Sequence, residues 1–339
     1  MDAKITKIRL SRMLSYDWFK IVLGAAGLIL VWALIFTTTA TRITAAQQFT
    51  VFNYVGNASF MNTRFSDLYS KAFTENVFSY EVIEINNNDL ASNAEYASTV
   101  MEARVATDEG DVMFVADVDN PDTAIENEDG TVSYEYTYLE TMLLNYSYYF
   151  YDLNPENENS FFGKMETYLN GFYQGDWTNE ENLDKVKVEE QFRARVKKDK
   201  RYKTEKQREQ GVLDDIERIE KYRDALETFY GYLDAEIVSF TTTVFSDREQ
   251  AEDAYYPKDG IYSINLCPNE KMESLKTYVG YYQEVIDENG DTHYPMTAAN
   301  MNVAFFRFDA VEEGFQYESL LFVNYLIESS LEQTPSTNE

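Results

Sequence analysis

The run at residues 111–116, Asp-Val-Met-Phe-Val-Ala, is the stretch of this chain that indicates its fold. It is short and continuously apolar after its first residue, which is typical of a strand buried on both faces in a parallel sheet. Parallel strands need long crossover connections, and these are usually helices. The residues before this run should therefore alternate between strand and helix.

The preceding sequence shows that alternation. β-branched and aromatic residues predict strands at 48–55 and 77–85. Apolar residues at helical spacing predict a helix at 62–73, and a capping box at Ser92 and Glu95 predicts the start of another. Three strands alternating with two helices predict an α/β fold with right-handed crossovers and a doubly wound sheet.

Beyond residue 130 the pattern becomes mainly helical. An apolar and aromatic segment at 139–151 predicts a buried helix, and residues 179–233 predict helix almost throughout, with a break at Gly211. β patterns then return. The remaining predicted elements are strands at 235–245, 260–266 and 301–308, helices at 271–282 and 315–331, and a hairpin turn at Asn289-Gly290. A chain that leaves the α/β lobe after Ala116 and returns near Ala235 predicts two lobes.

Residues 21–36 form an uncharged apolar run in a chain whose formal net charge is −30. With Trp18 and the threonines at 37–39 the run reaches about 20 residues, which spans a hydrocarbon core of ~30 Å. The flank before it has a net charge of +3, so the positive-inside rule places that flank in the cytoplasm. Signal peptides have shorter cores and leaders. We therefore expect a retained single-pass anchor, with cleavage after the small residues at 43–46 as the alternative.

These patterns divide the chain into a tail, an anchor and a large external part. The predicted divisions are a cytoplasmic tail at 1–17, a transmembrane anchor in the lipid bilayer at 18–40, α/β lobes at 46–130 and 235–331, a mostly helical lobe or insertion at 131–234, and a disordered tail at 332–339. The expected location is the cell membrane, with the C-terminal domain outside.

Composition narrows the class of protein. Cys267 is the only cysteine, so no internal disulfide is possible, and a composition of 44% hydrophobic residues must supply the core instead. Without the +3 flank the remainder carries −33, which repels nucleic acid. The acidity favours solubility over calcium binding, because neither 117–122 nor 287–291 completes a calcium-binding loop. The composition is typical of a bacterial surface protein.

Two segments resemble a known family. Residues 103–117 (Ala-Arg-Val-Ala-Thr-Asp-Glu-Gly-Asp-Val-Met-Phe-Val-Ala-Asp) and the apolar helix at 317–327 resemble the extracellular solute-binding proteins of bacterial ABC transporters. The resemblance covers about half of the external part. It implies a divergent, membrane-anchored member with a two-lobe, periplasmic-binding-protein-like domain. Such a domain closes on a small polar ligand and delivers it to an ABC permease or a neighbouring membrane sensor.

Ligands of open α/β sheets bind beyond the carboxyl ends of the strands. Tyr54 and Asn57 follow the first predicted strand, and Asp117 and Asp119 follow the third, so these four residues are candidates for ligand binding. The alternative is that they are ordinary turn residues. Four aromatic residues elsewhere in the chain could stack on a sugar ring, because Tyr and Trp combine an apolar face with a polar tip. These candidates are Tyr173, Trp177, Tyr255 and Tyr256, for which burial in the core is the alternative.

Residues 185–208 hold eleven basic and four acidic residues in an otherwise acidic chain. This basic block is either a solvated helix face paired with acidic neighbours or a surface that docks an acidic partner. The candidate docking residues are Lys197, Lys198, Lys200 and Arg201.

Catalytic patterns are weak. The single histidine, His293, is predicted on an exposed hairpin, and Cys267 is predicted to be a buried apolar residue. We therefore predict a protein that is not an enzyme and has no cofactor or metal. The expected function is binding of a small polar ligand, a sugar or oligosaccharide. The alternative is a cell-surface scaffold that docks another membrane protein.

Overall fold

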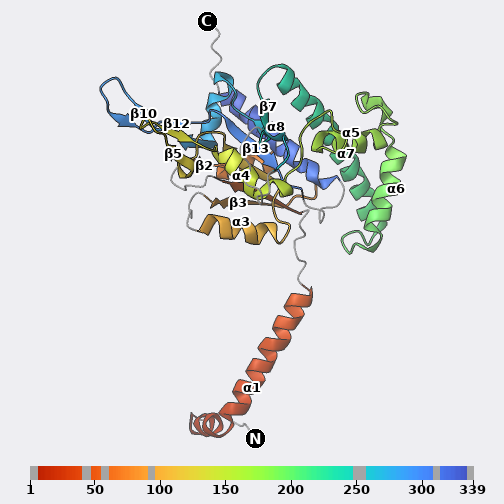
Figure 1. Ribbon diagram of the computed structural model, residues 1–339. Coiled ribbons are helices and arrows are strands. Elements are labelled where there is room, and N and C mark those ends of the chain that lie inside the picture. The colour runs from red at the N-terminus through yellow and green to blue at the C-terminus, as the bar shows by residue number, and fades with distance from the viewer. Residues whose placement is uncertain are drawn as a thin grey trace. The chain divides into compact units, whose positions relative to one another are not determined.

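The computed structural model describes residues 7–39, 47–54, 61–90, 96–246, 257–307 and 314–333. The chain divides into two compact units, Met1–Thr44 and Ala45–Glu339. The first unit holds the helix α1 (Lys7–Thr39), drawn in red in Figure 1. Its apolar stretch, Trp18–Thr37, is long enough to serve as a membrane anchor or a signal sequence.

A six-stranded sheet forms the centre of the second unit, with the strand order β3-β1-β4-β13-β8-β7 (Figure 1). The strands are β1 (Gln48–Asn53), β3 (Glu84–Asp89), β4 (Val112–Ala116), β7 (Ser239–Thr243), β8 (Gly260–Asn265) and β13 (Met301–Phe305). β3, β1 and β4 are parallel, whereas β13, β8 and β7 pair in antiparallel fashion. The sheet is therefore mixed, and the predicted α/β class is confirmed.

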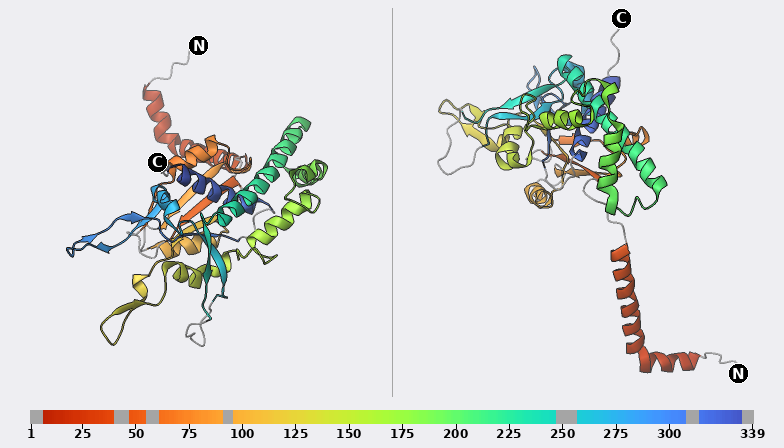
Figure 2. Two further views of the ribbon diagram at one scale, coloured as in Figure 1. Left: turned by 90° about the horizontal axis from the view of Figure 1, so that it is seen from above. Right: turned by 90° about the vertical axis from the view of Figure 1, so that its right-hand side faces the viewer.

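Helices and small β ladders surround this sheet. The helices are α2 (Ser66–Thr74), α3 (Ala97–Val105), α4 (Tyr138–Tyr146), α5 (Phe161–Phe172), α6 (Lys185–Arg195), α7 (Glu205–Asp234) and α8 (Glu318–Gln333). A three-stranded ladder joins β12 (Met296–Thr297), β9 (Val279–Tyr282) and β2 (Met61–Thr63). Two hairpins join β5 (Ala124–Glu126) to β6 (Val132–Tyr134) and β10 (Val285–Ile286) to β11 (Thr292–His293). Figure 2 shows α5, α6 and α7 on the opposite side of the sheet from the β10–β11 hairpin.

Aromatic packing holds α8 and α2 on one face of the sheet. Phe322 of α8 is fully buried, and its ring centroid lies 5.0 Å from that of Phe49 in β1 and 6.3 Å from that of Phe114 in β4. Phe65, at the start of α2, lies 6.1 Å from the same ring. Because rings of this size each bury a large apolar area, this cluster is a major source of the domain's stability.

The predicted order strand, helix, strand, helix, strand is confirmed up to β4, which is buried along its whole length. The second strand is displaced, because it was predicted at 77–85 and begins at Glu84. The apolar residues that suggested the earlier start serve tertiary contacts instead. The Phe78 ring stacks 6.2 Å from Phe322, and the Ser79 amide donates to Glu318.

Two helix predictions were wrong for packing reasons. α7 runs through Gly211 without a break, and the chain turns instead before the capping box of Thr204 and Gln207. Gly211 is needed because a Cβ there would lie 2.2 Å from Phe192 Cζ. The helix predicted at 271–282 ends early, since the 3-10 helix Glu270–Thr277 is followed by strand β9.

Other predictions stay open. Ser92 and Glu95 lie outside the described residues, as do residues 334–339 of the predicted tail, whereas α8 continues to Gln333. The two-lobe division also stays a prediction. Residues Ala45–Glu339 form one compact unit, which is not divided further into lobes.

Replacing Gly211 with alanine should destabilise the domain, by roughly 1–3 kcal/mol, because the added methyl group overpacks the Phe192 ring. Gly231 on the same helix is the matched control, since a Cβ added there would meet nothing within 4 Å. Gly231→Ala should stabilise by up to about 1 kcal/mol through helix propensity. Urea unfolding of residues Ala45–Glu339 measures both, and equal stabilisation by the two variants would contradict the packing at Gly211.

Candidate functional site

The parallel half of the sheet has a topological switch point between β1 and β4. The chain runs from β1 through α2 to β3 on one side of β1, then through α3 to β4 on the other side. Two predicted residues follow these strands directly, Tyr54 after β1 and Asp117 after β4. The Tyr54 amide donates to the Phe114 carbonyl at 2.9 Å. The structure thus brings Tyr54 and Asp117 to the edge of the sheet that is formed by the carboxyl ends of β1 and β4, where ligands of open α/β sheets bind.

Tyr54 is held in place by α4. Its side chain is buried, and its ring lies edge-on to Tyr146 with centroids 6.4 Å apart. Burial, with smaller effects from Tyr146 and Asp122, raises the pKa of Tyr54 to about 12. The phenol therefore stays protonated at neutral pH and is available as a hydrogen-bond donor or acceptor.

Asp117 and Asp119 make this edge acidic. Asp117 is half-buried, and burial raises its pKa, while a hydrogen bond with Thr137 lowers it and the nearby Glu140 and Asp119 raise it further. Asp119 is exposed, and its backbone forms a bridge with Thr137. Carboxylates at this edge accept hydrogen bonds from hydroxyl groups and repel anions.

In the loop after β4, the side chain of Asn120 is already occupied. Asn120 is buried, its amide nitrogen donates to Thr141, and its side-chain oxygen accepts the Asp122 amide. In the second acidic loop, Asp287 accepts the amides of Asn289 and Asp291, which closes the hairpin turn. Over the described ranges, no three His, Cys, Asp or Glu side chains group as metal ligands.

The predicted aromatic residues do not all join this edge. Tyr173 is buried at the end of α5, and Trp177 lies 6.4 Å from the ring of Tyr230 in α7. The end of α5 packs on α7, and the Trp177 ring contacts Tyr230 there. Three further candidates, Asn57, Tyr255 and Tyr256, lie outside the described residues.

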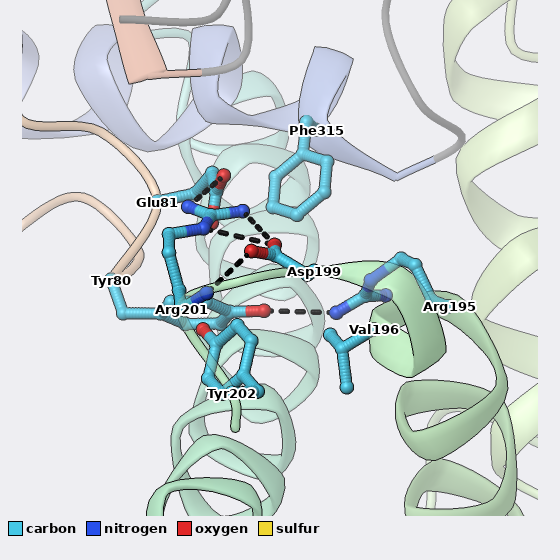
Figure 3. A pocket seen from close by; sticks show the side chains of 8 residues that line it. All are labelled: Tyr80, Glu81, Arg195, Val196, Asp199, Arg201, Tyr202 and Phe315. Atoms are coloured by element: carbon cyan, nitrogen blue, oxygen red, sulfur yellow. Dashed lines mark hydrogen bonds and ion pairs between the residues drawn. The ribbon is translucent and has the colours of Figure 1, made fainter. Parts of the chain in front are cut away.

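Part of the basic block turns inward. Arg201 donates to Glu81 at 2.8 Å and to Asp199 at 2.7 and 2.9 Å, around a cavity of about 40 Å³ (Figure 3). These bonds raise the pKa of Arg201, with Asp199 as the largest cause. Arg195 lines the same cavity and donates to the Tyr80 hydroxyl at 2.8 Å. These contacts tie the basic block to the segment before β3.

The three lysines among the predicted docking residues face outward. Lys197, Lys198 and Lys200 are exposed, and no ion pair within the described part of the chain involves them. They differ in this from Arg201, the fourth predicted docking residue. The structure therefore leaves a small cluster of free positive charge at the turn between α6 and α7.

Sequence reasoning missed a set of buried charges beneath this block. Asp215 and Arg218 of α7 are each 1% exposed and are joined by a 2.8 Å bond. Glu318 of α8 is 2% exposed and accepts the Tyr222 hydroxyl at 2.6 Å. The sequence does contain one indication of these buried charges. Asp215, Arg218 and Tyr222 lie at spacings of three and four on the apolar side of the helix.

The two candidate reactive side chains are placed as predicted. His293 is exposed on the β10–β11 hairpin, 3.3 Å from Asp287. Cys267 is buried, and burial raises the pKa of its thiol to about 12. The thiol therefore stays protonated and is a poor nucleophile.

Comparison of the chain with models of known families, with curated proteins and with solved structures found no significant match.

Asp111, at the start of β4, should make stability depend on pH. Burial raises its pKa to about 7, against an ordinary value of 3.8, despite the bond from the Thr50 amide. The folded state thus keeps a proton that the unfolded chain releases, so Asp111 lowers stability as pH rises from about 4 to about 7. Asp111→Asn removes this titration. Urea unfolding at several pH values should show the variant gaining on the native chain across that window, and parallel curves would contradict it.

Proposed function

We propose that this protein is a membrane-anchored, non-catalytic binding protein whose external domain binds a small polar ligand at the carboxyl edge of β1 and β4. The observation that carries the proposal is the switch point of the strand order, with Tyr54 and Asp117 at its two strand ends. A sugar or oligosaccharide suits this edge. Its hydroxyls can donate to the carboxylates of Asp117 and Asp119, and an anionic ligand would be repelled.

The anchor and the resemblance to solute-binding proteins of ABC transporters suggest the setting. The apolar stretch Trp18–Thr37 follows a flank of +3, which supports a cytoplasmic N-terminus. The family resemblance supports a two-lobe domain that delivers its ligand to an ABC permease or reports it to a membrane sensor. The exposed His293 and the protonated Cys267 favour binding over catalysis.

The orientation can be tested with intact, wall-stripped cells. Added protease should digest the domain Ala45–Glu339 and leave a small anchor fragment in the membrane, because the positive flank stays inside. Lysed cells are the control for protease access. Survival of the large domain in intact cells, with digestion only after lysis, would contradict the orientation.

Ligand binding can be tested by calorimetric titration of residues Ala45–Glu339 against a panel of carbohydrates. We expect one sugar class to bind and Asp119→Ala to weaken it roughly tenfold or more, as loss of a hydrogen bond to a charged group does. Glu128→Ala, on the exposed turn of the β5–β6 hairpin, is the matched control. Equal binding by both variants would remove Asp119 from the site.

The alternative function is a surface scaffold that docks another membrane protein. The observation that favours it is the outward cluster of Lys197, Lys198 and Lys200, which suits an acidic partner. The same titration separates the two functions. No carbohydrate binding at millimolar concentration would favour the scaffold.

A further inference from the structure

The turn between α6 and α7, residues 197–203, carries positive charge that the domain does not neutralise. Four of its lysines are exposed, and no ion pair within the described ranges involves them: Lys197, Lys198, Lys200 and Lys203. The carboxylates nearest in sequence are already paired, Asp199 with Arg201 and Glu205 with two arginines outside the turn. This lysine turn is therefore a free basic patch on a chain whose net charge is −30.

Internal contacts fix the lysine turn at one edge of the sheet. Arg201, within the turn, donates to Glu81 at 2.8 Å (Figure 3). Two residues after Glu81, the Ile83 amide donates to the Gln47 carbonyl at 2.9 Å, and β1 and β3 begin as paired parallel strands directly afterwards. The lysine turn is thus tied to the amino edge of β1 and β3, where the chain enters the domain.

The connection from the apolar stretch to this edge is short. Nine residues, 38–46, separate Thr37 at the end of that stretch from Gln47. An extended chain advances at most ~3.5 Å per residue, so β1 begins within about 35 Å of the hydrocarbon core when the stretch spans a bilayer. A compact domain of this size is roughly 50 Å across. The tether therefore keeps the amino edge of the sheet close to the membrane surface.

Electrostatics then favours one face of the domain toward an anionic membrane. The field of a charged surface decays over about 8 Å at physiological ionic strength, so only residues close to the surface respond to it. Each lysine that reaches such a surface strengthens the attraction about fivefold. Most of the acidic residues belong to parts of the domain beyond this range, and those that approach are repelled. A free basic patch at the tethered edge should therefore turn toward the lipid.

We propose that the lysine turn docks on the anionic phospholipid headgroups of the membrane that holds the anchor. Lysine ammonium groups on flexible stems suit the phosphates of headgroups, which lie in no fixed pattern. Docking of the amino edge leaves the carboxyl edge, with Tyr54 and Asp117, on the far side of the sheet and open to ligand. The proposal rests on the anchor of the proposed function, and it does not depend on the identity of the ligand.

The test uses the full chain in lipid nanodiscs made of phosphatidylcholine alone or mixed with phosphatidylglycerol. Acetylation of each lysine by a soluble reagent is followed by mass spectrometry. Lys197, Lys198 and Lys200 should react several-fold more slowly in the anionic discs, and high salt should abolish the difference. Lys271 is the internal control, because it is exposed and follows β8 at the opposite edge of the sheet. It should react equally in both discs.

Three results would overturn the proposal. Equal reaction of the turn lysines in the two discs would exclude lipid docking, whatever the carbohydrate titration shows. Protection of these lysines by soluble polyglutamate, but not by anionic discs, would assign the turn to an acidic protein. A chain that does not enter the discs would remove the anchor and the docking together. Failure to bind any carbohydrate, with the turn lysines still protected, would leave the docking in place.

A charge-removal variant locates the contact. Lys197→Gln, Lys198→Gln and Lys200→Gln are combined, and the melting temperature should not change because these exposed side chains form no ion pair among the described residues. Lys203 remains as the reporter, and its slower reaction in anionic discs should be lost. Lys271→Gln is the control variant and should leave that protection intact. Protection of Lys203 that persists in the combined variant would overturn the assignment.

Discussion

The carboxylate of Asp215 is the interaction on which the placement of the helical part depends. One of its oxygens accepts from Arg195 of α6 and Arg218 of α7, both at 2.8 Å, and from the Tyr80 hydroxyl at 3.2 Å. Burial acts to raise the pKa of Asp215, but the charges of Arg218 and Arg195 outweigh it and lower that pKa. A buried charge of this kind is tolerated only when it is paired. Losing one partner would therefore disturb α6, α7 and the segment before β3 together.

That segment owes its irregular shape to the same contacts. Its consecutive residues meet four different neighbours, because Phe78 packs on Phe322, the Ser79 amide donates to Glu318, Tyr80 bonds to Asp215 and Glu81 pairs with Arg201. A strand in this position would alternate its side chains between two faces and could not make all of these contacts. The sheet begins only at Glu84, where the chain can pair with β1.

Sequence patterns predicted what depends on local periodicity. β4 was recognisable because five successive apolar residues have one explanation in an α/β chain, and Tyr54 and Asp117 followed from the ends of the predicted strands. The predicted start of β3 and the predicted break of α7 at Gly211 were wrong, since both depend on partners distant in sequence. The pairing of Arg201 with Glu81 could not be predicted for the same reason, because the two residues lie 120 positions apart in the sequence.

In the basic block, the arginine and lysine side chains make different contacts. Arg195 and Arg201 each reach two acceptors, and their planar forks hold the block against the rest of the domain. Lys197, Lys198 and Lys200 have flexible stems and strongly hydrated heads, and they stay in solvent. The inward arginines fix where the turn between α6 and α7 lies, and the outward lysines then carry its charge. The positive surface at this turn is therefore held in position by the domain's own ion pairs, and the acidic partner proposed above would bind it without reorganising the domain.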